Sequence, residues 1–160
     1  MYTYYMIENT TTPALFEMSG HLIRRLNQQS TAVFQHRLKA AGRDITAVQF
    51  SALASLSTQP GIDQATLAAL IEYDRATIGG VVKRLEHKNL IKRKPNENDR
   101  RAFHLYLTPE GTELLGDVWP IVVSLQDDIL SGLSDDEKIT LVELMKKALR
   151  LDEATDSTHS

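Results

Sequence analysis

The feature that most constrains this fold is a pair of short helical segments joined by a tight connection. Asp63 is placed to cap the segment QATLAALIEY, and Asp74 is placed to cap the segment RATIGGVVKRLEHKN. The second segment has one apolar face, formed by Ile78, Val81, Val82 and Leu85. Only the residues near Tyr73 separate the two segments, and this layout predicts a helix-turn-helix motif.

Two short segments with strand character follow the second helix. They are LIKRKP and AFHLYLT, and the latter alternates Phe103, Leu105 and Leu107 with Ala102, His104 and Tyr106. The polar stretch NENDRR lies between them, directly after Pro95. These segments predict a β-hairpin with a long polar tip, which is the wing of a winged helix-turn-helix module.

Helical patterns flank this module on both sides. An apolar stripe through Leu15, Leu22 and Val33 predicts one long helix from about Pro13 to Ala41, which Gly42 ends. Because a second apolar strip runs beside the first, we expect this helix to pack between partners, such as another subunit.

Capping patterns mark the starts of three more helices. Thr46 and Gln49 form a capping box for a helix to about Leu56, and Ser134 begins another capping box for a helix to about Leu149. Thr108 and Pro109 begin a long apolar-periodic helix that Pro120 should kink or split.

These elements define the predicted fold class, which is mainly α with a small β-hairpin wing. The winged helix-turn-helix module spans residues 42–108, and helical regions at residues 13–41 and 109–150 flank it. We expect residues 151–160 to form a flexible tail.

Composition excludes several classes of function. The chain has no cysteine, which excludes disulfides, thiolate metal sites and cysteine nucleophiles. Its five histidines show no metal-ligand spacing, and its adjacent acidic pairs point in different directions on a helix. We therefore expect no enzyme activity, cofactor or metal.

The N-terminus lacks the features of a secretory signal and no segment is apolar enough to span a membrane, so we expect a cytoplasmic protein.

Positive charge is concentrated in one part of the chain. Residues 75–104 hold nine Lys and Arg against three acids, although the whole chain has a net charge of −3. Because an anionic partner responds to the local field within about 8 Å, this distribution indicates a nucleic-acid partner.

The helix-turn-helix assigns roles to these residues. The N-terminal residues of its second helix meet base edges in the major groove of DNA, which places Arg75, Ala76, Thr77 and Gly80 at the groove floor. Six more basic side chains could meet phosphates, unless they are solvated surface charges: Lys83, Arg84, Lys88, Lys92, Arg93 and Lys94. Gly79 and Gly80 are weak helix formers, so they serve either a close approach to DNA or tight helix packing.

The tip of the wing carries two adjacent arginines. A hairpin beside a recognition helix lies over the minor groove, whose narrow stretches attract inserted arginine. We expect Arg101 to insert, Asp99 to orient its guanidinium group, and Arg100 to contact phosphate. The alternative is a surface ion pair.

The stretch from Leu67 to Gly111, LAALIEYDRATIGGVVKRLEHKNLIKRKPNENDRRAFHLYLTPEG, resembles the DNA-binding core of MarR-family transcriptional regulators. The family's wing pattern D-x-R followed by L-T-x-x-G is present as Asp99, Arg101, Leu107, Thr108 and Gly111. The resemblance covers residues 13–150 in layout. It implies that residues 42–108 are the DNA-binding domain and that residues 13–41 and 109–150 are a helical dimerisation region. The implied protein is a homodimer joined through its first and last helices that binds a pseudo-palindromic operator, usually represses, and is released by a small ligand.

The resemblance also implies a class of ligand, because family members often bind phenolic or aromatic carboxylic acids. The segment GHLIRRLNQQ resembles the first helix of relatives that control degradation of aromatic acids. Arg25, Gln29 and His36 fall along one edge of that helix, so Arg25 is the candidate carboxylate partner, with Arg24, His21 and His36 as further candidates. The alternative is an arginine at an interface or on the surface.

One rival function remains open from the residues. A winged helix can also serve protein contact or RNA binding without operator specificity. In that case, substitution of Arg75 or Thr77 would cause only a modest loss of specificity.

Overall fold

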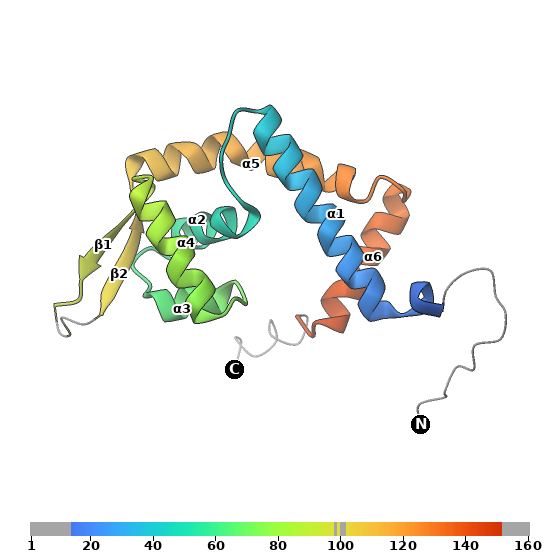
Figure 1. The fold of residues 1–160 in the computed structure, drawn as a ribbon, viewed down its shortest axis with the longest axis horizontal. Coiled ribbons are helices and arrows are strands. Elements are labelled where there is room, and N and C mark those ends of the chain that lie inside the picture. The colour runs from blue at the N-terminus through green and yellow to red at the C-terminus, as the bar shows by residue number, and fades with distance from the viewer. Residues whose placement is uncertain (1–13, 98, 100–101, 152–160) are drawn as a thin grey trace, which may run out of the picture. The chain divides into compact units, whose positions relative to one another are not determined.

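The computed structural model of this chain describes residues 14–97, 99 and 102–151. The described residues up to Leu125 form one compact unit, and those from Gln126 onward form a second. Figure 1 shows the predicted mainly helical chain with one antiparallel hairpin, so the predicted fold class is confirmed. The elements are η1 (Ala14–Glu17), α1 (Ser19–Ala40), α2 (Ala47–Thr58), α3 (Gln64–Leu70), α4 (Arg75–His87), β1 (Ile91–Pro95), β2 (Phe103–Leu107), α5 (Pro109–Ile129) and α6 (Asp135–Ala148).

The first helix begins later than the apolar stripe predicts. Residues 14–17 form a separate 3-10 turn, and Met18 is extended, with φ −88° and ψ 119°, so α1 starts at Ser19. No side chain caps this start, and Gly20 in the first turn costs roughly 1 kcal/mol relative to alanine.

The end of α1 follows the prediction. Gly42 has φ 69°, and its backbone N donates to the Lys39 carbonyl oxygen. The backbone N of Arg43 donates to the Leu38 carbonyl oxygen. This pair of bonds is a Schellman motif, in which the left-handed position favours glycine.

The predicted caps are present at the other helices. Thr46 with Gln49 and Ser134 with Glu137 form complete capping boxes. Thr108 caps α5, since its hydroxyl accepts from the backbone N of Gly111 at 3.0 Å. Helix α5 continues through Pro120, so the chain does not split there.

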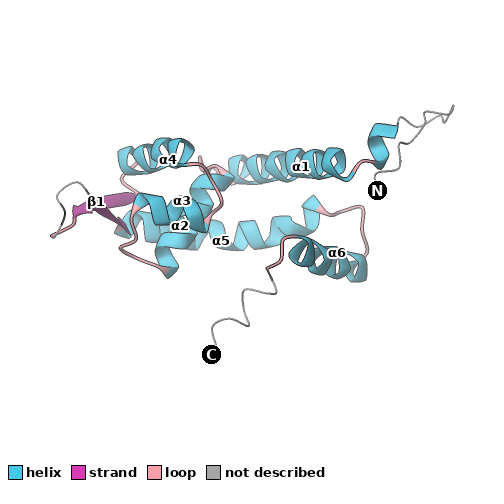
Figure 2. Cartoon of the chain, turned by 90° about the horizontal axis from the view of Figure 1, so that it is seen from below, coloured by secondary structure: helices cyan, strands magenta, loops and turns pink. Residues whose placement is uncertain are grey.

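The core of the first unit lies among α2, α3, α4 and the hairpin. The predicted inner face of α4 is fully buried: Ile78, Val81, Val82 and Leu85 all have 0% exposure. Figure 2 shows α4 packed over α2 and α3, with the hairpin beside them. This packing fixes α4 on one face and leaves its opposite face to solvent.

The wing is anchored to the loop between α2 and α3. Strands β1 and β2 pair antiparallel, with Arg93 opposite Leu105. Leu105 also pairs on its other side: its N donates to the Ile62 carbonyl oxygen at 2.9 Å, and its carbonyl accepts from Gly61 N at 2.8 Å. Strand β2 is therefore held between β1 and a backbone segment of the helical core.

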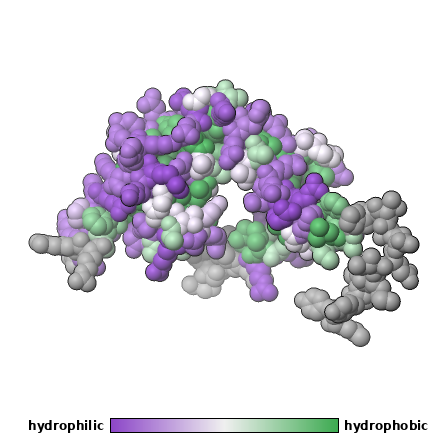
Figure 3. Space-filling view, in the orientation of Figure 1, coloured by the Kyte–Doolittle hydropathy of each residue, from purple (hydrophilic) through white to green (hydrophobic). Residues whose placement is uncertain are grey.

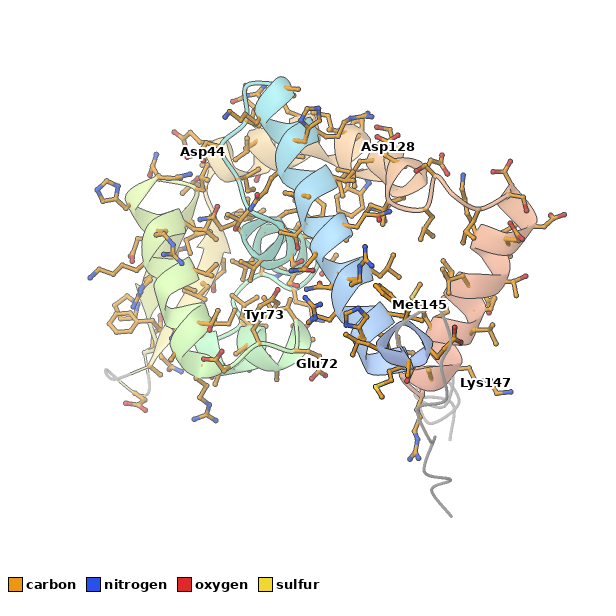
Figure 4. The ribbon with its side chains drawn as sticks, turned by 45° about the vertical axis from the view of Figure 1, so that its right-hand side comes forward. Asp44, Glu72, Tyr73, Asp128, Met145 and Lys147 are labelled. Atoms are coloured by element: carbon orange, nitrogen blue, oxygen red, sulfur yellow. The ribbon has the colours of Figure 1, made fainter. Side chains whose placement is uncertain are left out.

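The second unit contains the end of α5 and helix α6. Lys138 contacts Asp127 at 3.0 Å and Asp135 at 3.3 Å. Several apolar side chains of α6 remain exposed, including Ile139 at 63% and Leu144 at 58%. Figure 4 labels Met145 and Lys147, which project from α6 in different directions. Among the described residues, no helix combines the length and the apolar character that a membrane span needs.

Candidate nucleic-acid interface

The connection between α3 and α4 is a tight turn with a glutamate in the left-handed conformation. Glu72 has φ 54°, its N donates to the Ala69 carbonyl oxygen, and Tyr73 N donates to the Ala68 carbonyl oxygen. Figure 4 shows Glu72 and Tyr73 at this turn. A non-glycine residue in this conformation costs about 1–2 kcal/mol, which the packing of the two helices must offset. The predicted helix-turn-helix motif is therefore present.

The N-terminus of α4 is held by one aspartate. Asp74 Oδ1 accepts from the backbone N of Thr77 at 2.8 Å, and Asp74 Oδ2 accepts from the Thr77 hydroxyl. The hydroxyl bond and then the backbone bond hold the pKa of Asp74 below its usual value. Arg75, Ala76 and Thr77 are all exposed. The predicted groove residues thus lie on a capped, accessible helix end.

One stripe of α4 lies opposite its buried face. Ala76, Gly80, Lys83 and His87 recur at steps of four, three and four residues, which places them in line on a helix. Figure 3 shows a mainly hydrophilic surface over α4. His87 was not among the predicted contacts, although the same spacing could have identified it.

The two glycines of α4 have different surroundings. A Cβ atom on Gly79 would lie 3.3 Å from Nε2 of Gln64 at the start of α3. On Gly80, the nearest atom would be a terminal nitrogen of Arg84 at 3.6 Å, which is an ordinary contact. Helix packing therefore accounts for Gly79 but not for Gly80, and the close approach to DNA remains the prediction for Gly80.

The basic residues of the wing differ in their contacts with acidic and aromatic side chains of the protein. Arg93 Nε lies 3.0 Å from a Glu86 carboxylate oxygen, close enough for an ion pair although not aligned as a hydrogen bond. The Arg93 guanidinium carbon is also 6.0 Å from the centre of the Phe103 ring. Lys92 and Lys94 are exposed, on the other face of β1. Lys94 Nζ lies 4.9 Å from the centre of the Tyr106 ring. Arg93 and Lys94 thus both contact other groups of the protein, and Lys92 is exposed.

Three further basic residues lie on α4 or at its end. Lys83 and Arg84 are exposed along the helix. Lys88 Nζ, by contrast, lies 2.6 Å from Asp44 Oδ2 and 2.7 Å from the Asp44 carbonyl oxygen. Lys88 therefore joins the C-terminus of α4 to the loop after α1, and this ion pair lowers the pKa of Asp44.

The tip of the wing is described only in part. The backbone N of Ala102 donates to the Asp99 carbonyl oxygen at 3.0 Å, and Asn96 N donates to the Ala102 carbonyl oxygen at 2.9 Å. Asp99 is exposed. Arg100 and Arg101 lie outside the described residues, so their roles at phosphate and in the minor groove remain predictions.

The pattern L-T-x-x-G after the wing has a structural explanation. The Thr108 hydroxyl donates to the Asn89 carbonyl oxygen at 2.6 Å and accepts from Gly111 N. Thr108 N donates to the Leu90 carbonyl oxygen. A Cβ atom on Gly111 would lie 2.0 Å from that same oxygen. Thr108 and Gly111 therefore fasten the start of α5 to the segment that connects α4 with β1.

A cation-rich cluster lies at the start of α1, where the ligand was predicted. The Arg25 guanidinium carbon is 5.4 Å from the centre of the Phe16 ring, and the His21 ring meets Phe16 edge-on at 5.4 Å. Arg24 contacts His21 Nδ1 at 3.5 Å. The structure therefore brings together three predicted ligand residues around Phe16, an aromatic side chain that the helical pattern did not single out.

The other two predicted ligand residues lie further along α1. Gln29 is exposed one turn beyond Arg25. His36 is eleven residues beyond Arg25, which corresponds to about 16 Å along a helix. The cluster at Phe16 therefore does not include His36.

Comparisons with known proteins identify the family. The sequence profile of the MarR family matches residues 45–103, which cover α2, the helix-turn-helix and the first residue of β2. The chain is 32% identical over 137 residues to the HTH-type transcriptional repressor NicR of Pseudomonas putida, an alignment that covers 86% of this chain and 85% of NicR. The chain belongs to the MarR family. The predicted resemblance is confirmed, and this MarR-family protein is a transcriptional regulator with a DNA-binding winged helix.

Solved structures of MarR-family regulators support the same fold. One is BpsR of Bordetella bronchiseptica, whose DNA binding is regulated by 6-hydroxynicotinic acid. It has a TM-score of 0.76 and 28% identity, and covers 88% of this chain and 97% of its own. Another is a cysteine-to-serine mutant of MarR from Escherichia coli complexed with operator DNA. It also has a TM-score of 0.76 and 28% identity, with coverage of 87% and 99%.

Proposed function

We propose that this MarR-family regulator is a homodimeric repressor that binds a pseudo-palindromic operator and is released by an aromatic or phenolic carboxylic acid. The observation that carries the proposal is the exposed N-terminus of α4, which Asp74 caps and which a stripe of small and basic residues follows. A helix fits the major groove of DNA, and this end would reach the base edges.

The contacts divide into two groups by the chemistry of the side chains. Arg75, Ala76, Thr77 and Gly80 would meet bases, because they occupy the first turns of α4. The exposed cations would meet phosphates and supply affinity without sequence information: Lys83, Arg84, Lys92 and, with part of their charge engaged within the wing, Lys94 and Arg93. Asp99, Arg100 and Arg101 would bring the wing to the minor groove.

Exposed apolar side chains support a homodimer through the terminal helices. Ile23 of α1 is 67% exposed, and Leu149 after α6 is 69% exposed. Large apolar side chains exposed to this degree are what an interface with another subunit would cover. A two-fold dimer would present two copies of α4, which matches a pseudo-palindromic site.

The cluster around Phe16 supports an aromatic acid as effector. Arg25 would bind the carboxylate, and Phe16 would provide an apolar wall for the ring. His21 and Arg24 would add donors. The regulation of BpsR by 6-hydroxynicotinic acid and the repressor NicR are consistent with this class of ligand and with repression.

Two measurements test these proposals separately. Selection from a random duplex library should enrich a palindrome that a purified dimer binds, and failure to enrich one would favour a protein or RNA partner. Isothermal titration with a set of aromatic acids should then give binding that Arg25→Ala weakens. Unchanged affinity in Arg25→Ala would remove Arg25 from the ligand site.

A further inference from the structure

The bonds between Asp74 and Thr77 fix where the Thr77 hydroxyl points its proton. Asp74 Oδ1 accepts from the Thr77 backbone N, and Asp74 Oδ2 is bonded to Thr77 Oγ1. An ionised carboxylate has no proton to donate. The hydroxyl must therefore be the donor in the second bond, and its only proton is used within the protein.

The Asp74 carboxylate remains an ionised acceptor of the Thr77 hydroxyl proton at neutral pH. The pKa of Asp74 is lowered, first by the Thr77 hydroxyl and then by backbone bonds, so the group stays ionised. A hydroxyl has one donor and two acceptor lone pairs. The exposed Thr77 side chain therefore offers a bound molecule acceptor lone pairs and a methyl group, but no donor.

An acceptor distinguishes between bases in the major groove. Adenine N6 and cytosine N4 carry amino protons that can be donated, whereas guanine and thymine present acceptors at the corresponding positions. We infer, on the basis of the operator binding proposed above, that Thr77 is a specificity-determining residue that selects adenine or cytosine at the base it contacts in each half-site.

Exchange of the capping residue should relax this preference. Asparagine caps helices about as well as aspartate, and its Oδ1 would still be needed by the Thr77 backbone N. In Asp74→Asn, the side-chain amide nitrogen would then donate to Thr77 Oγ1 and release the hydroxyl proton. Thr77 could then donate to DNA as well as accept through its remaining lone pair, so guanine or thymine should be admitted beside adenine or cytosine at that position.

A second variant removes the acceptor and keeps the shape of the side chain. In Thr77→Val, discrimination at the same position should fall by about two- to tenfold, which corresponds to one neutral hydrogen bond. Positions that other residues contact should keep their preferences.

The chain offers a matched control at the start of α3. Asp63 Oδ1 accepts from the Thr66 backbone N at 2.7 Å, and the Thr66 side chain also bonds to Asp63. Asp63→Asn makes the same chemical change at a helix that does not provide the base contacts. It should leave the preferred sequence unchanged.

The test is selection of duplexes from one random library by the wild type, Asp74→Asn, Thr77→Val and Asp63→Asn. Enrichment of guanine or thymine beside adenine or cytosine at that position in Asp74→Asn, and not in Asp63→Asn, supports the inference, and an unchanged sequence in Asp74→Asn overturns it. If the wild type enriches no sequence, the proposed operator binding itself fails, and the inference fails with it.

A measurement on the free protein tests the bond without DNA. Titration of the Asp74 carboxyl by NMR should show a pKa below the usual value in the wild type and a higher one in Thr77→Val. If the substitution leaves that pKa unchanged, the hydroxyl does not donate to Asp74 and the inference is overturned.

Discussion

Replacement of Gly80 by alanine should stabilise the free protein and weaken its binding to DNA. Gly80 lies in the second turn of α4, and among the described glycines only Gly42 and Gly61 have positive φ. The added Cβ atom would have Arg84 as its nearest neighbour, at 3.6 Å. No strain or clash therefore opposes the change in the absence of DNA.

The helix propensities give the size of the stability effect. Alanine is favoured over glycine by about 0.8–1.0 kcal/mol inside a helix. In a chain of this length, that gain corresponds to a rise in Tm of about 2–4 °C, measurable by thermal unfolding. If the α4 backbone approaches DNA at Gly80, the methyl group should cost roughly 1–3 kcal/mol of operator affinity, about the effect of one mismatched base pair.

Gly79→Ala is the matched control in the same helix. Its Cβ atom would lie 3.3 Å from the end of the Gln64 side chain, so the gain in stability should be smaller. Operator affinity should not change, because Gly79 packs towards α3. If Gly80→Ala is more stable yet binds the operator like the wild type, the reasoning about close approach at Gly80 is refuted.

Three further outcomes follow from the contacts described. Gly111→Ala should lower the free energy of unfolding in urea by about 3 kcal/mol, because its Cβ atom would lie 2.0 Å from the Leu90 carbonyl oxygen. Lys83→Gln should reduce the salt slope of operator binding by about 0.9 per protomer, whereas Lys88→Gln should leave it unchanged, since the loop after α1 already binds that ammonium group. The Asp63 carboxyl has a lowered pKa, so its stabilisation is present above its unfolded pKa and is lost as pH falls through the folded value. The difference in unfolding free energy between the wild type and Asp63→Asn should therefore shrink below about pH 4, and a constant difference would contradict this.

Local chemistry in the sequence was sufficient to predict most of the elements. The caps at Asp63, Asp74 and Ser134 depend on side chains within three residues, and all are present. The break at Met18 was not predictable in this way, because the apolar stripe continues through it. Neither was Glu72 in a left-handed turn, because this conformation is imposed by the packing of two helices.

The candidate site was predicted less completely, because it depends on contacts between distant residues. Arg93 of β1 forms an ion pair with Glu86 of α4. Lys88 forms one with Asp44, which lies 44 positions earlier in the sequence. A count of charges along the sequence does not distinguish these paired cations from the exposed Lys83. The stacking of Phe16 on Arg25 likewise requires the 3-10 turn before α1, which the sequence pattern did not predict.

The most direct test of operator binding is fluorescence anisotropy with the selected duplex at two salt concentrations. The wild type should be compared with Arg101→Ala and with Lys39→Ala, a control that removes an exposed cation of α1. The account predicts tight, salt-dependent binding that Arg101→Ala weakens and Lys39→Ala does not. Equal binding by all three proteins, or no binding to any duplex, would contradict it.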